Sequence, residues 1–374
     1  MPCDQGLQGT TWKDRHGRRM RPVVYGLLAC VLAAGLTRGA QAQIRSDEVV
    51  QFFPTAAKLQ DDGGGWIGTI HGWIYEPEED DFLRSRLIHF LLQQFGEDAT
   101  APERERLAAR ARLYLVDSEG GKRIDIRIGD QTFPLARSGH DGHFESEITL
   151  TDELVGQSQG DWLRFSAITE PGDDRQFAGH LLIVPATGIS VVSDLDDTIK
   201  ISEATNRRQL MVNTFLRDFE AVPGMAEKYQ QWRNAGAVFH YVSASTWQLY
   251  RPLADFMQEA GFPRGTMHLK YFRIKDRSLF DLFTEPREIK LPVIKSLVLA
   301  YPGRRFVLVG DSGQQDPELY GEIARRHPHQ VVRIYIRDIT GETRDHERYQ
   351  RAFADVPAER WELFNDPSRL VLSP

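Results

Sequence analysis

ISVVSDLDDTIK, residues 189–200, is the stretch that decides the fold of this chain. Its apolar, β-branched first half predicts a buried strand of a parallel sheet. Three carboxylates, Asp194, Asp196 and Asp197, follow within four positions. Burying like charges at a strand end is very unfavourable unless a cation or a phosphoryl group organises them. Because ligands of open α/β sheets bind beyond the carboxyl ends of the strands, this stretch predicts a ligand site rather than an acidic turn that only caps the next helix.

Two further apolar strands end in polar residues that complete the pattern. The strand predicted at 238–242 is followed by Ser243, and the strand at 306–309 is followed by Asp311 and, five residues later, Asp316. A helix that begins at Lys290 precedes the third strand. The alternation of strands and helices after Gly188 predicts an α/β Rossmann-like domain with a parallel sheet. We expect the tips of its three strands to converge on one pocket.

The three strand ends carry the residues needed for phosphoryl transfer. Asp194 would attack phosphorus and form an aspartyl-phosphate. Asp196 would protonate the leaving alkoxide and then deprotonate the attacking water. Asp194, the backbone carbonyl of Asp196, and Asp311 would hold Mg²⁺, a hard cation that prefers oxygen ligands. Asp197 is predicted to be a turn residue or to support the metal ligands without binding the metal itself, and Lys200 either meets an anionic substrate or lies on the surface.

Other polar residues would bind the phosphoryl oxygens. Ser243 and Lys290 would donate hydrogen bonds to them and stabilise the charge of the transition state. Lys295, five residues later on the same helix, competes with Lys290 for this role. Thr198 is expected beside the phosphate, and Asp316 would tie down the metal-binding loop or orient Lys290.

The N-terminal segment, residues 1–42, has the pattern of a secretory signal peptide. Three arginines within residues 18–21 precede an apolar run at 23–36, and small residues at 40–42 allow cleavage before Gln43. The run is too short to span a bilayer comfortably. We therefore expect an exported protein, periplasmic or secreted.

The composition is that of a globular protein. The chain has 374 residues, 41% of them hydrophobic and 26% charged, and this length predicts two domains. Removal of residues 1–42 would take away both cysteines, Cys3 and Cys30, and shift the formal net charge from −7 to −11. So acidic a chain argues against nucleic acid as a partner.

Residues 43–187 are expected to form a smaller, β-sandwich-like domain with a helical insertion near its start. Turn residues separate short strand-like runs at 66–75, 113–116, 124–128, 144–150, 163–167 and 177–185. Helical periodicity is present at 81–95 and 102–112. The first of these helices has a wide apolar face, which either packs on the sandwich or contacts lipid.

Residues 188–374 are expected to form the catalytic domain. Its further helices are predicted at 211–219, 226–234 and 247–260. The segment 263–283 is predicted to be irregular, and 331–336 to be the last core strand.

The motifs resemble those of the haloacid dehalogenase superfamily of phosphohydrolases. More narrowly, residues 191–200, 239–250 and 306–320 resemble the family of the fungal actin-patch phosphatidate phosphatase and its bacterial relatives, which is related to the lipin-type catalytic region. The resemblance covers 188–338 and is weaker before it. It implies Mg²⁺-dependent conversion of phosphatidate to diacylglycerol with Asp194 as the nucleophile. Thr246 departs from the pattern, since the family usually has proline after Ser-Ala-Ser.

The sequence therefore predicts a phosphoric monoester hydrolase of lipid metabolism, with phosphatidate or another phosphomonoester as substrate and with possible peripheral membrane contact. One alternative is a phosphatase of soluble phosphomonoesters. Another is a non-catalytic lipid-binding or scaffold module whose catalytic residues are relics. The complete set of acid, base, serine, lysine and metal ligands argues against the relic.

Overall fold

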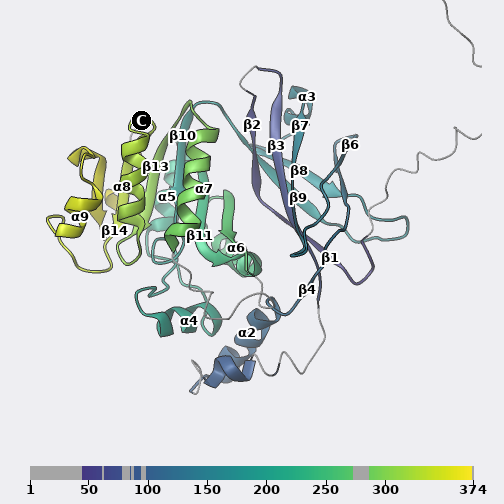
Figure 1. Cartoon of the computed structure of the whole chain (residues 1–374), viewed down its shortest axis with the longest axis horizontal. Helices are drawn as coiled ribbons and strands as arrows, with labels where there is room; N and C mark the ends of the chain where they lie inside the picture. Colours follow the sequence, from purple (N-terminus) through teal and green to yellow (C-terminus); the bar gives the residue numbers. More distant parts are fainter. Residues whose placement is uncertain are drawn as a thin grey trace, which may run out of the picture. The chain divides into compact units, whose positions relative to one another are not determined.

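The computed structural model describes residues 44–60, 63–77, 85, 88–93, 98–272 and 286–372. The predicted signal peptide lies outside these residues. The described residues gather in one compact unit. Two β-sheets follow one another along this part of the chain (Figure 1).

Among the described residues, nine strands form the N-terminal sheet, which is mixed and mostly antiparallel. Its path is β1-β3-β2-β9-β8-β5-β6, with β4 and β7 also paired to β3, and the β2–β9 pair is parallel. The strands are β1 (Val49–Phe53), β2 (Thr55–Leu59), β3 (Trp66–Glu76), β4 (Asp117–Ser118), β5 (Asp125–Ile128), β6 (Gln131–Pro134), β7 (His143–Leu150), β8 (Trp162–Ala167) and β9 (Ala178–Val184).

Strand β3 organises this sheet because it pairs along both edges. Ile70 and Ile74 are fully buried in the core that the sheet encloses. Between them, Gly72 lies under the ring of Phe144, where a Cβ atom would come within 2.3 Å of the ring. The aromatic and β-branched alternation of this segment is typical of such a half-buried strand.

Two helices belong to this part of the chain, α2 (Ala101–Arg112) and α3 (Asp152–Val155). Helix α2 begins where Thr100 donates through its backbone N–H and its hydroxyl to Glu103 Oε2, at 2.8 and 2.7 Å. Of the helix predicted at 81–95, the described residues 85 and 88–93 are helical, and Leu91 packs in the hydrophobic core. No helix in the described ranges is long and apolar enough to cross a membrane.

In the described part of the chain, six parallel strands form the second sheet in the order β12-β11-β10-β13-β14-β15. They are β10 (Gly188–Ser193), β11 (Val238–Thr246), β12 (Thr266–Lys270), β13 (Arg304–Asp311), β14 (Val331–Arg337) and β15 (Trp361–Phe364). The α/β sheet predicted from the sequence is thus confirmed, as is a preceding β-rich part with a helical insertion.

Helices cover both faces of the parallel sheet. Val191 packs in the cluster that includes residues of α5 and α6, whereas Val192, the next residue of β10, packs in the cluster of α7 and α8. Figure 1 shows α7 and α8 running along the strands. The helices are α4 (Arg207–Phe215), α5 (Met225–Asn234), η1 (Trp247–Leu249), α6 (Tyr250–Glu259), α7 (Pro286–Ala300), α8 (Asp316–Arg326), α9 (Glu347–Ala352), η3 (Ala358–Arg360) and η4 (Pro367–Arg369).

The register of the three central strands sets the position of the site. Ser193 of β10 pairs with Tyr241 of β11 and with Val309 of β13. The residues that follow these positions therefore leave the sheet at the same edge, as the sequence predicted.

Several predicted elements differ from the structure. Residues 113–116 form a turn rather than a strand, and β12 lies inside the segment predicted to be irregular. A further strand, β15, follows the one predicted to be last. β12 and β15 lie at the two ends of the parallel sheet and are short, so their sequences carry little periodic signal.

Candidate active site

Asp194 directly follows β10 and is only 1% exposed. Its backbone N–H donates to Val309 O at 2.9 Å, which ties it to the neighbouring strand. Lys290 Nζ lies 2.9 Å from Asp194 Oδ1, and Thr198 Oγ1 donates to Asp194 Oδ2 at 3.3 Å. The fold thus brings the predicted nucleophile together with the predicted lysine and threonine.

Lys290 reaches the site from α7 and is 1% exposed. Its Nζ lies 2.8 Å from Asp316 Oδ1, at the start of α8, and 3.2 Å from Gln314 Oε1. Burial lowers the pKa of Lys290, but the carboxylates of Asp194 and Asp316 outweigh it and raise this pKa, so the ammonium stays charged. Lys295, the competing lysine, is exposed on the same helix.

Asp311 ends β13 and anchors the loop that follows it. Its Oδ1 accepts hydrogen bonds from the N–H groups of Gly313 and Gln314, at 2.6 and 3.0 Å. The Asp311 N–H donates to Asp316 Oδ2 at 3.2 Å. Gly310 allows this approach, because a Cβ there would lie 2.3 Å from that oxygen. Asp316 therefore contacts both the loop and Lys290, the two partners that the sequence offered as alternatives.

Asp194, Asp311 and Asp316 form a buried carboxylate cluster in which each offers an oxygen within 4.8 Å of the others. Burial raises the pKa of Asp311 to about 8, the charge of Asp316 adds to this, and burial likewise raises the pKa of Asp194 well above its ordinary value. Asp311 Oδ2 is buried and has no hydrogen-bond partner among the described residues. A cluster of oxygens with an unused buried acceptor fits a hard divalent cation such as Mg²⁺, whose charge would offset the repulsion.

Asp196 lies in a different environment. Its Oδ1 is 2.7 Å from Lys200 Nζ and accepts from Ser202 Oγ at 2.7 Å. Its Oδ2 accepts from Ser243 Oγ at 3.2 Å and from Ser245 Oγ at 3.1 Å. Although burial raises the pKa of Asp196, Lys200 and the hydroxyl donors outweigh it and hold this pKa at about 2. The predicted acid–base residue is thus a fully hydrogen-bonded carboxylate.

Asp197 shapes the loop between the two environments. Its φ is 55°, a left-handed conformation that costs free energy for most residues. Its carboxylate accepts from the N–H groups of Ser202, Glu203 and Ala204, at 2.8, 2.9 and 2.6 Å. Asp197 therefore occupies the turn position predicted for it, and its hydrogen bonds offset the backbone cost.

Three residues contact Asp196 although the sequence analysis did not predict these contacts. Lys200, placed by the sequence on the surface or against an anionic substrate, is 2% exposed and pairs with Asp196. Ser202 and Ser245 also donate to this carboxylate. The spacing of four residues between Asp196 and Lys200 could have indicated their pairing. The turn that brings them together is closed by a hydrogen bond from Lys200 N to Leu195 O at 2.9 Å.

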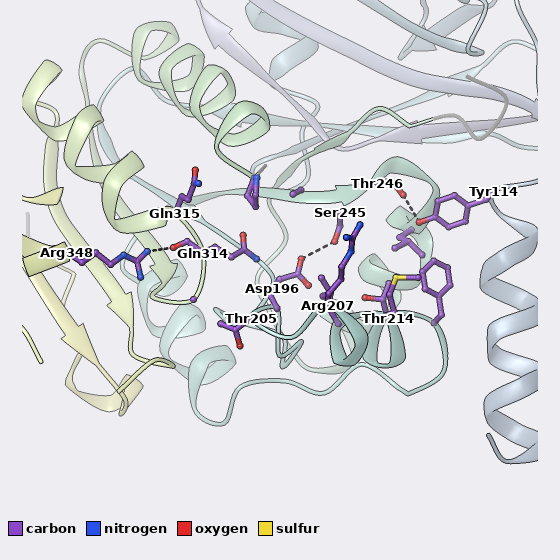
Figure 2. Close-up of a pocket in the computed structure, with 18 residues that line it drawn as sticks. Tyr114, Asp196, Thr205, Arg207, Thr214, Ser245, Thr246, Gln314, Gln315 and Arg348 are labelled. Atoms are coloured by element: carbon purple, nitrogen blue, oxygen red, sulfur yellow. Dashed lines mark hydrogen bonds between the residues drawn. The ribbon is translucent and has the colours of Figure 1, made fainter. Parts of the chain in front are cut away.

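A cavity of about 570 Å³ opens beside Asp196 (Figure 2). Its polar end includes Asp196, Ser245 and Gln314. Its other end is lined by the apolar side chains of Leu210, Met211, Phe215 and Leu249, together with Tyr114, Thr214 and Arg207. A ligand that fills this space would combine a charged group with an apolar one.

The parallel sheet and the aspartate, lysine and carboxylate cluster at its carboxyl edge fit the haloacid dehalogenase-like arrangement that the sequence motifs resemble. Residues 189–338 match the family described as "Phosphatidate phosphatase APP1, catalytic domain". The family resemblance predicted from the motifs is confirmed over this region, which is similar to that catalytic domain.

Two fungal proteins are similar in sequence. Phosphatidate phosphatase APP1 of Saccharomyces cerevisiae is 30% identical over 188 residues, which make up 49% of this chain and 30% of that protein. An uncharacterised protein of Schizosaccharomyces pombe is 29% identical over 175 residues, 45% of this chain and 28% of that protein. The matched part of this chain thus spans less than a third of each relative.

Among solved structures, one described as a beta-phosphoglucomutase from Thermotoga maritima aligns with 48% of this chain and 94% of its own, at 13% identity and a TM-score of 0.28. At this TM-score the fold class rests on the strand order of the sheet itself.

Proposed function

We propose that this protein is a Mg²⁺-dependent phosphatase that hydrolyses phosphomonoesters through an aspartyl-phosphate, with phosphatidate as substrate and diacylglycerol as product. The observation that carries the proposal is the buried Asp194 carboxylate, 2.9 Å from Lys290 Nζ and grouped with Asp311 and Asp316. The similarity to Phosphatidate phosphatase APP1 supports the choice of substrate. The apolar end of the cavity beside Asp196 supports it too.

Each residue has a role in the first step. Asp194 attacks phosphorus while the bond between phosphorus and the leaving oxygen breaks. The leaving alkoxide takes a proton from Asp196. Lys290 and Ser243 donate to the phosphoryl oxygens, where charge develops. When bound, Mg²⁺ would supply positive charge next to Asp194 and Asp311 and so reduce the repulsion between nucleophile and phosphate.

In the second step, water attacks the aspartyl-phosphate, its proton passes to Asp196, the bond to Asp194 breaks and inorganic phosphate leaves. The charged form of Asp196 in this structure suits this base role. For the first step Asp196 needs a proton, and an incoming phosphate dianion raises the pKa of a neighbouring carboxyl group. Arrival of the substrate would therefore prepare Asp196 to act as the acid.

The test is phosphate release from a panel of lipid and soluble phosphomonoesters, with Mg²⁺ and with a chelator. We expect Mg²⁺-dependent release that is fastest from phosphatidate. Faster release from soluble esters would instead identify a phosphatase of soluble phosphomonoesters. A folded protein that binds lipid and releases no phosphate would identify a non-catalytic module.

We also propose that residues 1–42 direct export to the periplasm or the medium, and that the mature chain divides near residues 187 and 188. Peptide sequencing of the N-terminus of the processed protein tests the first point, and limited proteolysis tests the second. For membrane contact, flotation with phosphatidate-containing liposomes is the direct measurement. A polar substitution of Leu91 would not isolate that contact, because Leu91 is a core residue.

A further inference from the structure

The apolar end of the cavity beside Asp196 is built by two distant parts of the chain. Leu210, Met211 and Phe215 come from α4, between the first and second strands of the parallel sheet. Tyr114, two residues after the end of α2 in the N-terminal part, has its ring 5.7 Å from the ring of Phe215 and also lines the cavity (Figure 2). The cavity therefore depends on how α2 and α4 are held together.

Two arginines of α2 hold the end of α4. Arg106 Nη1 donates to Leu216 O at 2.7 Å, and Arg110 Nη1 donates to Thr214 O and Arg217 O, at 2.6 and 2.8 Å. The last carbonyls of a helix have no partner within the helix, and a cation there also favours the helix dipole. These arginines thus satisfy the carboxyl end of the helix that forms the apolar wall.

Arg110 is built into the structure rather than free on its surface. It is 8% exposed, and its guanidinium lies 4.0 Å from the centre of the Phe219 ring. Arg106 adds an ion pair to Asp218 at 2.6 Å. In contrast, Arg112, two residues further along α2, is exposed.

A second connection joins Tyr114 to the catalytic edge of the sheet. The hydroxyls of Tyr114 and Thr246 lie 2.8 Å apart, and both residues are buried. Thr246 ends β11, the strand that carries Ser243 and Ser245. This hydrogen bond depends on the hydroxyl of Thr246.

We propose that α2 sets the substrate selectivity of the catalytic site. Arg106 and Arg110 fix α4, and Tyr114 fixes the end of β11, so that the cavity keeps the shape that receives the apolar group of a phosphomonoester. These are positioning residues, which act through α4 and β11 on the substrate. The inference rests on the proposed phosphatase function. It adds that substrate selectivity depends on α2, a helix that lies outside the matched residues 189–338.

The experiment compares kcat and KM for dioctanoyl phosphatidate with those for glycerol 3-phosphate, which lacks the apolar group. In Arg110→Met, which keeps the apolar contact with Phe219, two charge-assisted hydrogen bonds are lost. We expect KM for the lipid to rise about tenfold or more while kcat changes much less. KM for glycerol 3-phosphate should rise less. Arg112→Met, on the exposed side of the same helix, should match the wild type.

If Arg110→Met does not fold, as judged by circular dichroism, Tyr114→Phe serves as the second variant. It removes one hydroxyl, and we expect the ratio of the two KM values to shift by about fivefold. A folded variant that retains the wild-type ratio, or that loses activity equally on both substrates, overturns the proposal. If the wild type hydrolyses neither compound, the proposed function fails, and calorimetric binding of dioctanoyl phosphatidate to the same variants then decides the role of α2.

Discussion

Asp194 and Asp196 are two residues apart in the chain, yet their surroundings have opposite charge. Asp194 lies among further carboxylates with Lys290 as the cation in contact, and its pKa is raised by burial. Asp196 receives hydrogen bonds or an ion pair from Lys200 and three hydroxyls, and its pKa is held at about 2. The turn after Leu195 separates the two environments, because it folds Lys200 back onto Asp196.

The difference suits the two chemical roles that we propose for this short segment. A nucleophile that must meet a phosphate benefits from a nearby cation site, which the carboxylate cluster provides. A residue that must exchange protons needs donors that hold it in place. Substitutions on each side of the turn should therefore have different effects.

The largest effect is expected for Asp194→Asn. The amide is nearly the same size but is a very poor nucleophile, so phosphate release from phosphatidate micelles should fall by at least about 10⁴-fold. The fold should persist, because the substitution removes one of three repelling carboxylates. Phosphate release and circular dichroism check the two points, and undiminished turnover would rule out the mechanism.

Next in size is Lys290→Met. This variant loses the donor to the phosphoryl oxygens and leaves three buried carboxylates without their lysine, so kcat should fall about 10²- to 10³-fold. Its melting temperature should also fall, and Mg²⁺ should restore more of it than in the wild type. Lys295→Met, at the exposed position of the same helix, is the matched control. Equal losses in both variants would remove Lys290 from the site.

A smaller and more selective effect is expected for Lys200→Met on the other side of the turn. Without its lysine, Asp196 is less well positioned to protonate the leaving group. Release from an alkyl phosphate should therefore fall about 10- to 100-fold. Release from p-nitrophenyl phosphate should fall less, because p-nitrophenolate leaves without a proton. An identical loss on both esters would contradict an acid–base role for Asp196.

The smallest effect is a pH dependence of stability in a chelator. The pKa of Asp311 is about 8 in the folded protein, above its value of about 4 in an unfolded chain. Between these values the folded state binds more protons, so stability should rise as pH falls from 8 toward 5, by about 1 kcal/mol per unit. Urea unfolding of the wild type and of Asp311→Asn measures it. Because the pKa of Asp194 is raised too, the substitution should reduce the slope without abolishing it, and an unchanged slope would show that Asp311 does not contribute.

Much of the site was accessible from the sequence because strand ends carry a strong signal. An apolar run that stops at Asp194, Ser243 or Asp311 identifies both the strand and the edge at which its ligands meet. The partners of Asp196 were harder to predict. Lys200 is placed by the conformation of one turn, and Ser245 by the extension of β11 beyond its apolar part. Neither the turn conformation nor the extension of β11 produces a hydrophobic periodicity that sequence analysis can detect.

The outer strands were missed for a related reason. A short strand that pairs along only one edge has few residues to carry a pattern, so propensity and tertiary pairing compete in deciding its structure. β12 and β15 are such strands. Helix α4 begins at Arg207, four residues before the predicted start at 211. Asn206 caps it there, because its side-chain oxygen accepts hydrogen bonds from the N–H groups of Arg208 and Gln209 at 3.1 and 3.2 Å.

Strand β15 has a practical consequence for shortened versions of this protein. The family match stops at residue 338, but β15 supplies the outer neighbour of β14 from residues 361–364. A fragment trimmed to the matched boundaries would leave the backbone N–H and C=O groups along β14 open to pairing between molecules. A fragment chosen by sequence similarity alone would therefore have an exposed, aggregation-prone edge strand. A fragment that extends through Phe364 would keep this edge paired.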